Sequence, residues 1–273
     1  MNILVTLDRN YLKPLKVMLF SLVTSDPDHD FDVYVMNDTL TAKDLAGVTR
    51  AVGSRRLRLI DVKVGDKFFA EAPLTSYYPK EMYYRILAAQ ILPKELDRIL
   101  YLDPDLVVMR PLTPLYDMDF EHKYFIAASH VRTFMAALNK IRLRADEMEN
   151  YINSGVMMIN LDELRLHQDV TKVYEYIRAN KAVLILPDQD VIYGLYSTKI
   201  KLVDPDVYNM TERLLAAGEL SREKDIRWVV GNTAVVHYIG RNKPWKKNYV
   251  GKMAVFYYIY EDRMERQHRK GRK

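Results

Sequence analysis

The 273-residue chain contains no cysteine. This absence excludes disulfide bonds, thiolate nucleophiles and cysteine-ligated zinc sites, and it fits a reducing compartment. We therefore expect a cytoplasmic protein. The chain does not need disulfides for stability, because 49% of its residues are hydrophobic and can form a core of ordinary size.

Glycine is also scarce. The chain has ten glycines, and the closest pair, Gly47 and Gly53, stands six positions apart. A dinucleotide-binding fingerprint needs three glycines within one short turn, and a Walker loop needs a pair closer than this one. Neither motif can be present, so a bound nucleotide must be held by other means.

Long apolar runs are missing as well. The longest uncharged stretch, Trp228–Gly240, is interrupted by polar residues. A membrane-spanning helix needs about 20 predominantly apolar residues, so we expect none. The first apolar run ends at Asp8, too early for the apolar segment of a secretory signal.

The net charge of +5 is concentrated at one end of the chain. Residues 263–273 carry six basic side chains and one acid, Glu265, so the remainder sums to zero. A neutral body argues against a nucleic-acid-binding groove. The basic tail has two interpretations. It is either a peripheral contact with the anionic inner face of a membrane or a solvated end, with the aromatic segment Met253–Tyr260 buried in a C-terminal helix.

Apolar, β-branched segments alternate with segments of helical period. The predicted strands are Ile3–Leu7, Phe31–Met36, Leu57–Ile60, Ile99–Leu102, Ile126–Ala128, Val156–Ile159 and Val235–Tyr238. The predicted helices are Leu12–Leu22, Thr41–Val52, Glu81–Leu92, Leu161–Arg178 and one from about Gly251. This alternation predicts an α/β fold with a mostly parallel sheet between helices, in which ligands bind beyond the carboxyl ends of the strands.

Two carboxylates follow the predicted strand Ile99–Leu102. In Asp103-Pro104-Asp105, residues two apart in an extended segment point the same way, and proline favours an extended conformation for the residue before it. Two hard carboxylate ligands suit Mg²⁺ or Mn²⁺ shared with a diphosphate. The alternative is an ordinary turn, since aspartate and proline are common turn residues.

A second polar segment, His237–Trp245, begins where the predicted strand at Val235 ends. His237 can complete a carboxylate–carboxylate–imidazole metal site. Gly240 lets the backbone approach a ligand, and Lys243 can bind phosphate as a point charge. A histidine after a strand is also common as a purely structural residue.

Taken together, these segments resemble glycosyltransferase family 8, especially bacterial members such as the lipopolysaccharide galactosyltransferases. The resemblance covers roughly residues 1–250. It rests on Asp8–Tyr11, Tyr84-Arg85, Tyr101–Asp105, Asn153–Val156, Pro187–Asp190, His237–Gly240 and Lys243–Trp245, in the family's order. The departures are Ser154, where alanine is common, and Pro104 between the aspartates.

Membership would imply a single-domain nucleotide-sugar fold of the GT-A type, Rossmann-like, over residues 1–250, followed by a C-terminal helix and basic tail over 251–273. Mn²⁺, or alternatively Mg²⁺, would be held by Asp103, Asp105 and His237. UDP would be contacted by Thr6, Asp8, Asn10, Gly240 and Lys243. The sugar would be surrounded by Arg85, Asn153, Asp188 and Gln189. The resemblance also places Tyr77, Tyr78 and Trp245 in segments similar to the family's lid loops.

The same resemblance implies a UDP-hexose donor, galactose or glucose, and retention of anomeric configuration. A double displacement would need a carboxylate nucleophile, but the resemblance places Gln189 there, and an amide oxygen is a weak nucleophile. We therefore favour attack by the acceptor hydroxyl on the face from which UDP leaves, with Gln189 stabilising the reacting centre and Asp188 binding sugar hydroxyls. The acceptor would be a glycan or a lipid-linked sugar.

Two other functions compete with this interpretation. A catalytically silent UDP-sugar-binding protein would keep the same site without turnover, although every expected metal and donor position is filled. A protein that binds polyanions or RNA through its tail would show strongly salt-dependent binding and no response to UDP.

Overall fold

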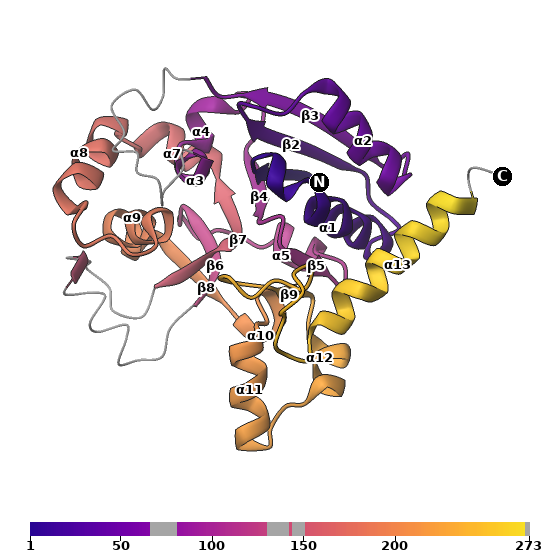
Figure 1. Ribbon diagram of the computed structural model, residues 1–273. Coiled ribbons are helices and arrows are strands. Elements are labelled where there is room, and N and C mark those ends of the chain that lie inside the picture. The colour runs from indigo at the N-terminus through magenta and orange to yellow at the C-terminus, as the bar shows by residue number, and fades with distance from the viewer. Residues whose placement is uncertain (66–80, 130–141, 144–150, 271–273) are drawn as a thin grey trace.

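The computed structural model describes residues 1–65, 81–129, 142–143 and 151–270 (Figure 1). Its centre is a seven-stranded sheet of order β3-β2-β1-β4-β7-β6-β8. The strands are β1 (Asn2–Thr6), β2 (Phe31–Asn37), β3 (Leu57–Lys63), β4 (Arg98–Leu102), β6 (Phe125–Ser129), β7 (Ile152–Asn160) and β8 (Ile200–Val203). Among these described strands, β7 alone runs antiparallel to its neighbours. The prediction of a mostly parallel α/β sheet is therefore confirmed.

Helices cover both faces of the sheet. They are α1 (Leu12–Ser25), α2 (Ala42–Val52), α3 (Glu81–Tyr84), α4 (Ala88–Ile91), α5 (Thr113–Tyr116), α7 (Leu161–His167), α8 (Val170–Asn180), α9 (Pro187–Tyr196), α10 (Pro205–Tyr208), α11 (Glu212–Ser221), α12 (Ile226–Asn232) and α13 (Ala254–Lys270), with short 3₁₀ turns at Arg9–Tyr11 and Ser197–Lys199. Side chains alternate along β1: Ile3 and Val5 pack with Leu15 of α1, whereas Leu4 joins a separate cluster with Val191 of α9. The sheet thus separates two apolar cores.

The last predicted strand lies outside the main sheet. It is β9 (Val235–His237), which pairs antiparallel with β5 (Leu106–Val108) in a second, two-stranded sheet. Neither β5 nor β8 was predicted. Each is only three or four residues long, too short to show a clear alternation, and β5 becomes a strand through a partner distant in sequence.

The predicted helix Glu81–Leu92 is in fact two short helices, α3 and α4. The Ile86 N–H donates to the Tyr83 carbonyl at 3.0 Å, which closes a tight turn between them. Arg85 stands in this turn with its side chain buried. The prediction of one helix was wrong. The apolar residues keep the spacing of a single helix across both α3 and α4, so the pattern does not show the turn between them.

The predicted helix Leu161–Arg178 is also broken, into α7 and α8. The Asp169 carboxylate accepts the N–H groups of Thr171 and Lys172 at 2.9 and 3.3 Å and caps the second helix. An aspartate that bonds the backbone ahead of it competes with helix continuation and starts a new helix instead.

Helix α13 packs against α1 and α2 at one side of the molecule (Figure 1). Met253, Phe256 and Tyr257 are buried, so much of the predicted aromatic segment belongs to the core. On the opposite face Val255 and Ile259 are 44% and 47% exposed.

In the part of the chain that the structure describes, no helix combines the length and the apolar character that crossing a membrane requires. Arg272 and Lys273 of the basic tail lie outside the described residues.

A buried carboxylate holds the start of α9. Asp190 is 0% exposed and accepts the N–H groups of Ile185 and Leu186 at 2.6 and 3.1 Å and the Tyr151 hydroxyl at 2.7 Å. Two nitrogens of the Arg142 guanidinium donate to its two oxygens at 2.9 Å each. This network fixes the helical turn that presents Asp188 and Gln189.

We expect Asp190→Asn to lower the free energy of unfolding by about 2–3 kcal/mol, because it leaves the Arg142 charge without its partner and sets an NH₂ group against backbone donors. Chemical denaturation measures the change. Asp262→Asn is the matched control: its ion pair with Arg266 is more than half exposed, so its loss should cost less than about 0.5 kcal/mol. Equal effects of the two variants would show that the Asp190 network does not hold α9.

Candidate active site

A cavity of about 350 Å³ opens where β4 ends. Because β7 is antiparallel to β4, the beginning of β7 lies at this same edge, and the Asp103 N–H donates to the Gly155 carbonyl at 2.8 Å. The cavity is lined by Arg85, Asp103, Asp105, Asn153, Ser154, Gly155, Leu186, Asp188, Gln189, Arg213, His237, Ile239 and Gly240. Eight of the twelve predicted site residues are among them.

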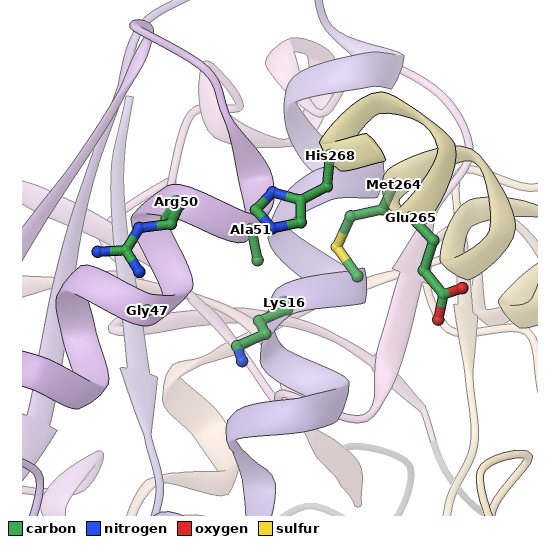
Figure 2. A pocket seen from close by; sticks show the side chains of 7 residues that line it. All are labelled: Lys16, Gly47, Arg50, Ala51, Met264, Glu265 and His268. Atoms are coloured by element: carbon green, nitrogen blue, oxygen red, sulfur yellow. The ribbon is translucent and has the colours of Figure 1, made fainter. Parts of the chain in front are cut away.

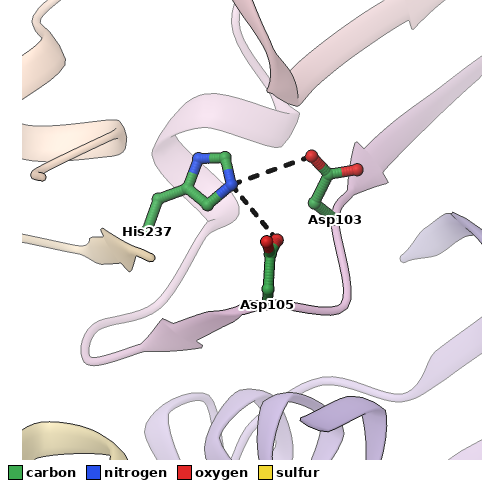
Figure 3. Close-up of side chains that lie close together, drawn as sticks. All are labelled: Asp103, Asp105 and His237. Atoms are coloured by element: carbon green, nitrogen blue, oxygen red, sulfur yellow. Dashed lines mark hydrogen bonds and ion pairs between the residues drawn. The ribbon is translucent and has the colours of Figure 1, made fainter. Parts of the chain in front are cut away.

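Asp103, Asp105 and His237 converge at this cavity (Figure 3). The β5–β9 ladder sets Leu106 opposite His237, and the Tyr238 N–H donates to the Asp105 carbonyl at 3.0 Å. The Nε2 atom of His237 lies 3.2 Å from Asp105 Oδ1 and 3.7 Å from Asp103 Oδ2. One ligand atom from each of the three residues falls within 4.8 Å of the others.

The chemistry of this group fits a divalent cation. The other ring nitrogen of His237, Nδ1, lies 2.8 Å from Asn209 Oδ1. An amide oxygen only accepts, so Nδ1 carries a proton, and Nε2 faces the two carboxylates, where it donates a second proton or gives its lone pair to a cation. Three electron-pair donors facing one point repel one another unless a cation or a proton lies between them, and carboxylates with imidazole are common ligands of divalent metals.

Gly155 is the residue that lets these side chains approach so closely. A Cβ atom at this position would lie 2.2 Å from His237 Cε1 and 2.6 Å from Asp103 Oδ2. Both distances are far below van der Waals contact. A larger residue would therefore displace the imidazole or the carboxylate.

Lys243 supplies a positive charge on the other side of Asp105. Its ammonium group donates to Asp105 Oδ2 and, at 2.6 Å, to the Tyr238 carbonyl. Burial alone would raise the pKa of Asp105, but the neighbouring His237 and Lys243 hold that pKa well below its ordinary value. The Asp105 carboxylate thus stays ionised and available as a ligand.

Arg85 connects the group of Asp103, Asp105 and His237 to α9. Its guanidinium lies 3.1 Å from Asp103 Oδ1 and 3.0 Å from Asp188 Oδ2, and it stacks 4.1 Å from the Tyr101 ring centre. Burial lowers the pKa of Arg85, but the negative charges of Asp103 and Asp188 outweigh burial and raise it, so the side chain remains a cation. Ser154 donates its hydroxyl to Asp188 at 2.7 Å. The carboxylate of Asp188 is thereby aimed at the cavity.

Gln189 and Asn153 supply amides to the same cavity. Gln189 is 3% exposed, and its Nε2 atom is buried without a hydrogen-bond partner among the described residues. Asn153 accepts the Gly155 N–H at 3.0 Å. A buried amide donor that faces a cavity is suited to an oxygen of a ligand.

Four predicted residues lie outside the cavity lining. Lys243 reaches it through Asp105, and Thr6 through the Tyr101 hydroxyl, which lies 3.1 Å from Thr6 Oγ1 and also donates to Asp103. Asp8 and Asn10 lie beyond β1 and bond to each other at 2.8 and 2.9 Å. The predicted lid residues Tyr77 and Tyr78 lie outside the described residues.

Tyr11 and Arg213 belong to the site but were not predicted. Burial, together with the negative charges of Asp105, Asp103 and Asp8, raises the pKa of Tyr11 to about 12. Tyr11 follows the half-buried Asp8 in the sequence, and its ring lies edge-on to that of Trp245, with 6.4 Å between the ring centres. The position of Tyr11 in the motif Asp8–Tyr11 could have identified it from the sequence. Arg213 lies in a helix that carries no motif, so the sequence offered no signal for it.

A second cavity, between α1, α2 and α13, is separate from this site (Figure 2). Lys16, Gly47, Arg50, Ala51, Met264, Glu265 and His268 line it. Figure 2 shows Arg50 and Glu265 pointing away from each other. None of the predicted site residues lies here, and its lining includes a single carboxylate.

Comparisons with known proteins identify the family of the chain. The profile of Glycosyl transferase family 8 matches residues 2–249. The lipopolysaccharide 1,2-glucosyltransferase of Escherichia coli is 26% identical over 244 residues, 88% of this chain and 71% of that protein. A crystal structure of the galactosyltransferase LgtC with donor and acceptor sugar analogs is 26% identical, with a TM-score of 0.80 and coverage of 96% of both chains. A second crystal structure, of an active-site mutant of LgtC in which a glutamine is replaced by glutamate, is 25% identical to this chain. Its TM-score is 0.81, and the match covers 96% of both chains. The chain belongs to glycosyl transferase family 8.

Proposed function

We propose that the protein transfers a hexose, galactose or glucose, from a UDP-sugar to a glycan or lipid-linked acceptor, with retention and in a Mn²⁺-dependent reaction. The observation that carries this proposal is the convergence of Asp103, Asp105 and His237 on the cavity that also holds Asp188 and Gln189. The relatives support it: the E. coli protein is a glucosyltransferase, and LgtC binds donor and acceptor sugar analogs.

Asp103, Asp105 and His237 would hold Mn²⁺, with Mg²⁺ as the alternative, and the bound ion would offset the charge of the departing diphosphate. Lys243 adds a fixed positive charge beside Asp105. Gly240, with a φ of 72°, allows a backbone turn next to this charge. These residues together assist the departure of UDP without a proton donor.

The remaining residues divide between the two ends of the donor. Uridine and ribose fit the end of β1, where Thr6, Asp8 and Asn10 lie. The hexose fits the cavity, where Arg85, Asn153, Asp188 and Gln189 surround it. Asp188 already accepts from Arg85 and Ser154, so we assign it to sugar hydroxyls rather than to nucleophilic attack.

The family implies retention, and Gln189 supplies no carboxylate nucleophile for a double displacement. Its amide oxygen can stabilise positive charge at the anomeric carbon, but it is a weak nucleophile. The acceptor hydroxyl then attacks on the face from which UDP leaves, and its proton passes to the departing phosphate oxygen.

We expect UDP to bind in the presence of Mn²⁺ and to lose at least about tenfold in affinity with chelator, by calorimetry. Asp105→Ala should cause a similar loss, because it removes a ligand. Gly155→Ala should do so as well, because its methyl group displaces His237 or Asp103. Asp262→Asn, on α13, serves as the control. Equal affinity for UDP with and without metal would contradict the proposal.

NMR of the first product from an α-linked UDP-hexose should show an α-glycoside. Gln189→Ala should reduce turnover by about 10²-fold or more while UDP affinity changes little, because the side chain faces the hexose and not the nucleotide. A β-linked product would exclude retention. UDP-sugar binding without hydrolysis or transfer would favour the catalytically silent alternative.

We also propose a peripheral contact between α13 and an anionic membrane surface. Val255, Tyr258 and Ile259 form an exposed apolar strip on one face of the helix, at 44%, 47% and 47% exposure. Arg263 and Arg266 follow one and two turns further along and are exposed. An apolar strip beside basic residues is the pattern by which helices lie on anionic lipid.

Vesicle co-sedimentation tests this contact. The protein should pellet with phosphatidylglycerol vesicles at low salt and remain in solution with phosphatidylcholine vesicles. Replacing Val255 and Ile259 by aspartate should abolish pelleting, whereas Leu220→Asp, at an 88% exposed position on α11, should not. We prefer substitutions to truncation because Met264 is buried and Gln267 donates to the Val52 carbonyl. If the double variant pellets like the wild type, the tail is a solvated end.

A further inference from the structure

Three cavity-lining residues have no part in the proposed donor site: Leu186, Arg213 and Ile239. Leu186 precedes α9, Arg213 stands in the first turn of α11, and Ile239 follows β9. The residues assigned to uridine follow β1, on the other side of β4 from β7. The cavity therefore has more lining than the proposed donor contacts use, and this part is left for the acceptor.

Arg213 is distinguished from the other cations of the site by its lack of a partner. Arg85 is paired with Asp103 and Asp188, and Lys243 is paired with Asp105. Arg213 lines the cavity from an exposed position, and within the described ranges of the chain it makes no hydrogen bond, ion pair or ring contact.

The carboxylate adjacent to Arg213 in sequence does not neutralise it. Glu212 accepts the Tyr249 hydroxyl and the Met253 N–H, both at 2.6 Å, from the segment that precedes α13. A methyl group on Gly251 would collide with this carboxylate at 2.4 Å, which shows how tightly it is enclosed. The guanidinium is thus left as a charge at the cavity wall.

We infer that Arg213 recognises an oxyanion, a phosphate or a carboxylate, on the acceptor, so that the acceptor is an anionic glycan or glycosyl-phosphate rather than a neutral sugar. This inference rests on the proposed function of the same cavity. A guanidinium binds both oxyanions through two parallel N–H donors, which orients the acceptor as well as holding it. Leu186 and Ile239 provide apolar surface for the sugar ring beside that charge.

Acceptor-side binding can be measured with the donor site filled by Mn²⁺ and UDP. The probes are methyl galactoside, its 6-phosphate and methyl galacturonoside, titrated by NMR. We expect the two anionic glycosides to bind the wild type about tenfold more tightly than the neutral one. Arg213→Gln should remove this preference, and Arg213→Lys should retain part of it, because lysine keeps the charge but not the planar fork.

Arg227→Gln is the matched control, since it removes one positive charge from an exposed position on α12. Its preference for anionic glycosides should equal that of the wild type. A preference that survives in Arg213→Gln, or is absent from the wild type, overturns the inference. If Arg213→Gln weakens UDP binding by the same factor, Arg213 serves the donor diphosphate instead. Failure of the wild type to bind UDP with Mn²⁺ is a separate result, which contradicts the proposed function itself.

Discussion

Three largely buried carboxylates, Asp103, Asp105 and Asp188, meet at one cavity, and the surrounding structure balances their charge. Like charges in a poorly solvated place repel strongly unless cations lie between them. Arg85 bridges Asp103 and Asp188, while Lys243 and His237 flank Asp105. The site is thereby a set of fixed charges, arranged before any ligand enters.

The backbone that holds these charges is built from two reversals of direction. β7 runs antiparallel to β4, which brings the Asn153–Gly155 segment to the edge of the sheet where β4 ends and Asp103 follows. The short β5–β9 ladder then brings His237 to Asp105. Each reversal is held by backbone hydrogen bonds, so the side chains are positioned by rigid elements rather than by free loops.

Arg85 shows why a break in regular structure can serve a site. A continuous helix over Glu81–Leu92 would satisfy the apolar pattern, yet the chain turns at Ile86 and Arg85 points into the cavity. The ion pairs with Asp103 and Asp188 offset the cost of burying the guanidinium. The apolar pattern favours one continuous helix, but the ion pairs of the folded protein favour the break at Arg85. Such conflicts between local pattern and tertiary contacts are common at functional sites.

The sequence alone determined the alternation of strands and helices, the parallel character of most of the sheet, and the motifs that place Asp103, Asp105 and His237 at or just after the ends of strands. These features are local, because periodicity and the residues that follow a strand are read within a few positions. Tertiary structure decided the β5–β9 pairing, the breaks in two predicted helices, and the entry of Tyr11 and Arg213 into the site. Those outcomes depend on contacts between segments far apart along the chain, such as Glu212 with Met253 and Leu106 with His237. A residue without a motif, like Arg213, acquires its role only when folding brings its helix to the cavity and leaves its charge without a partner there.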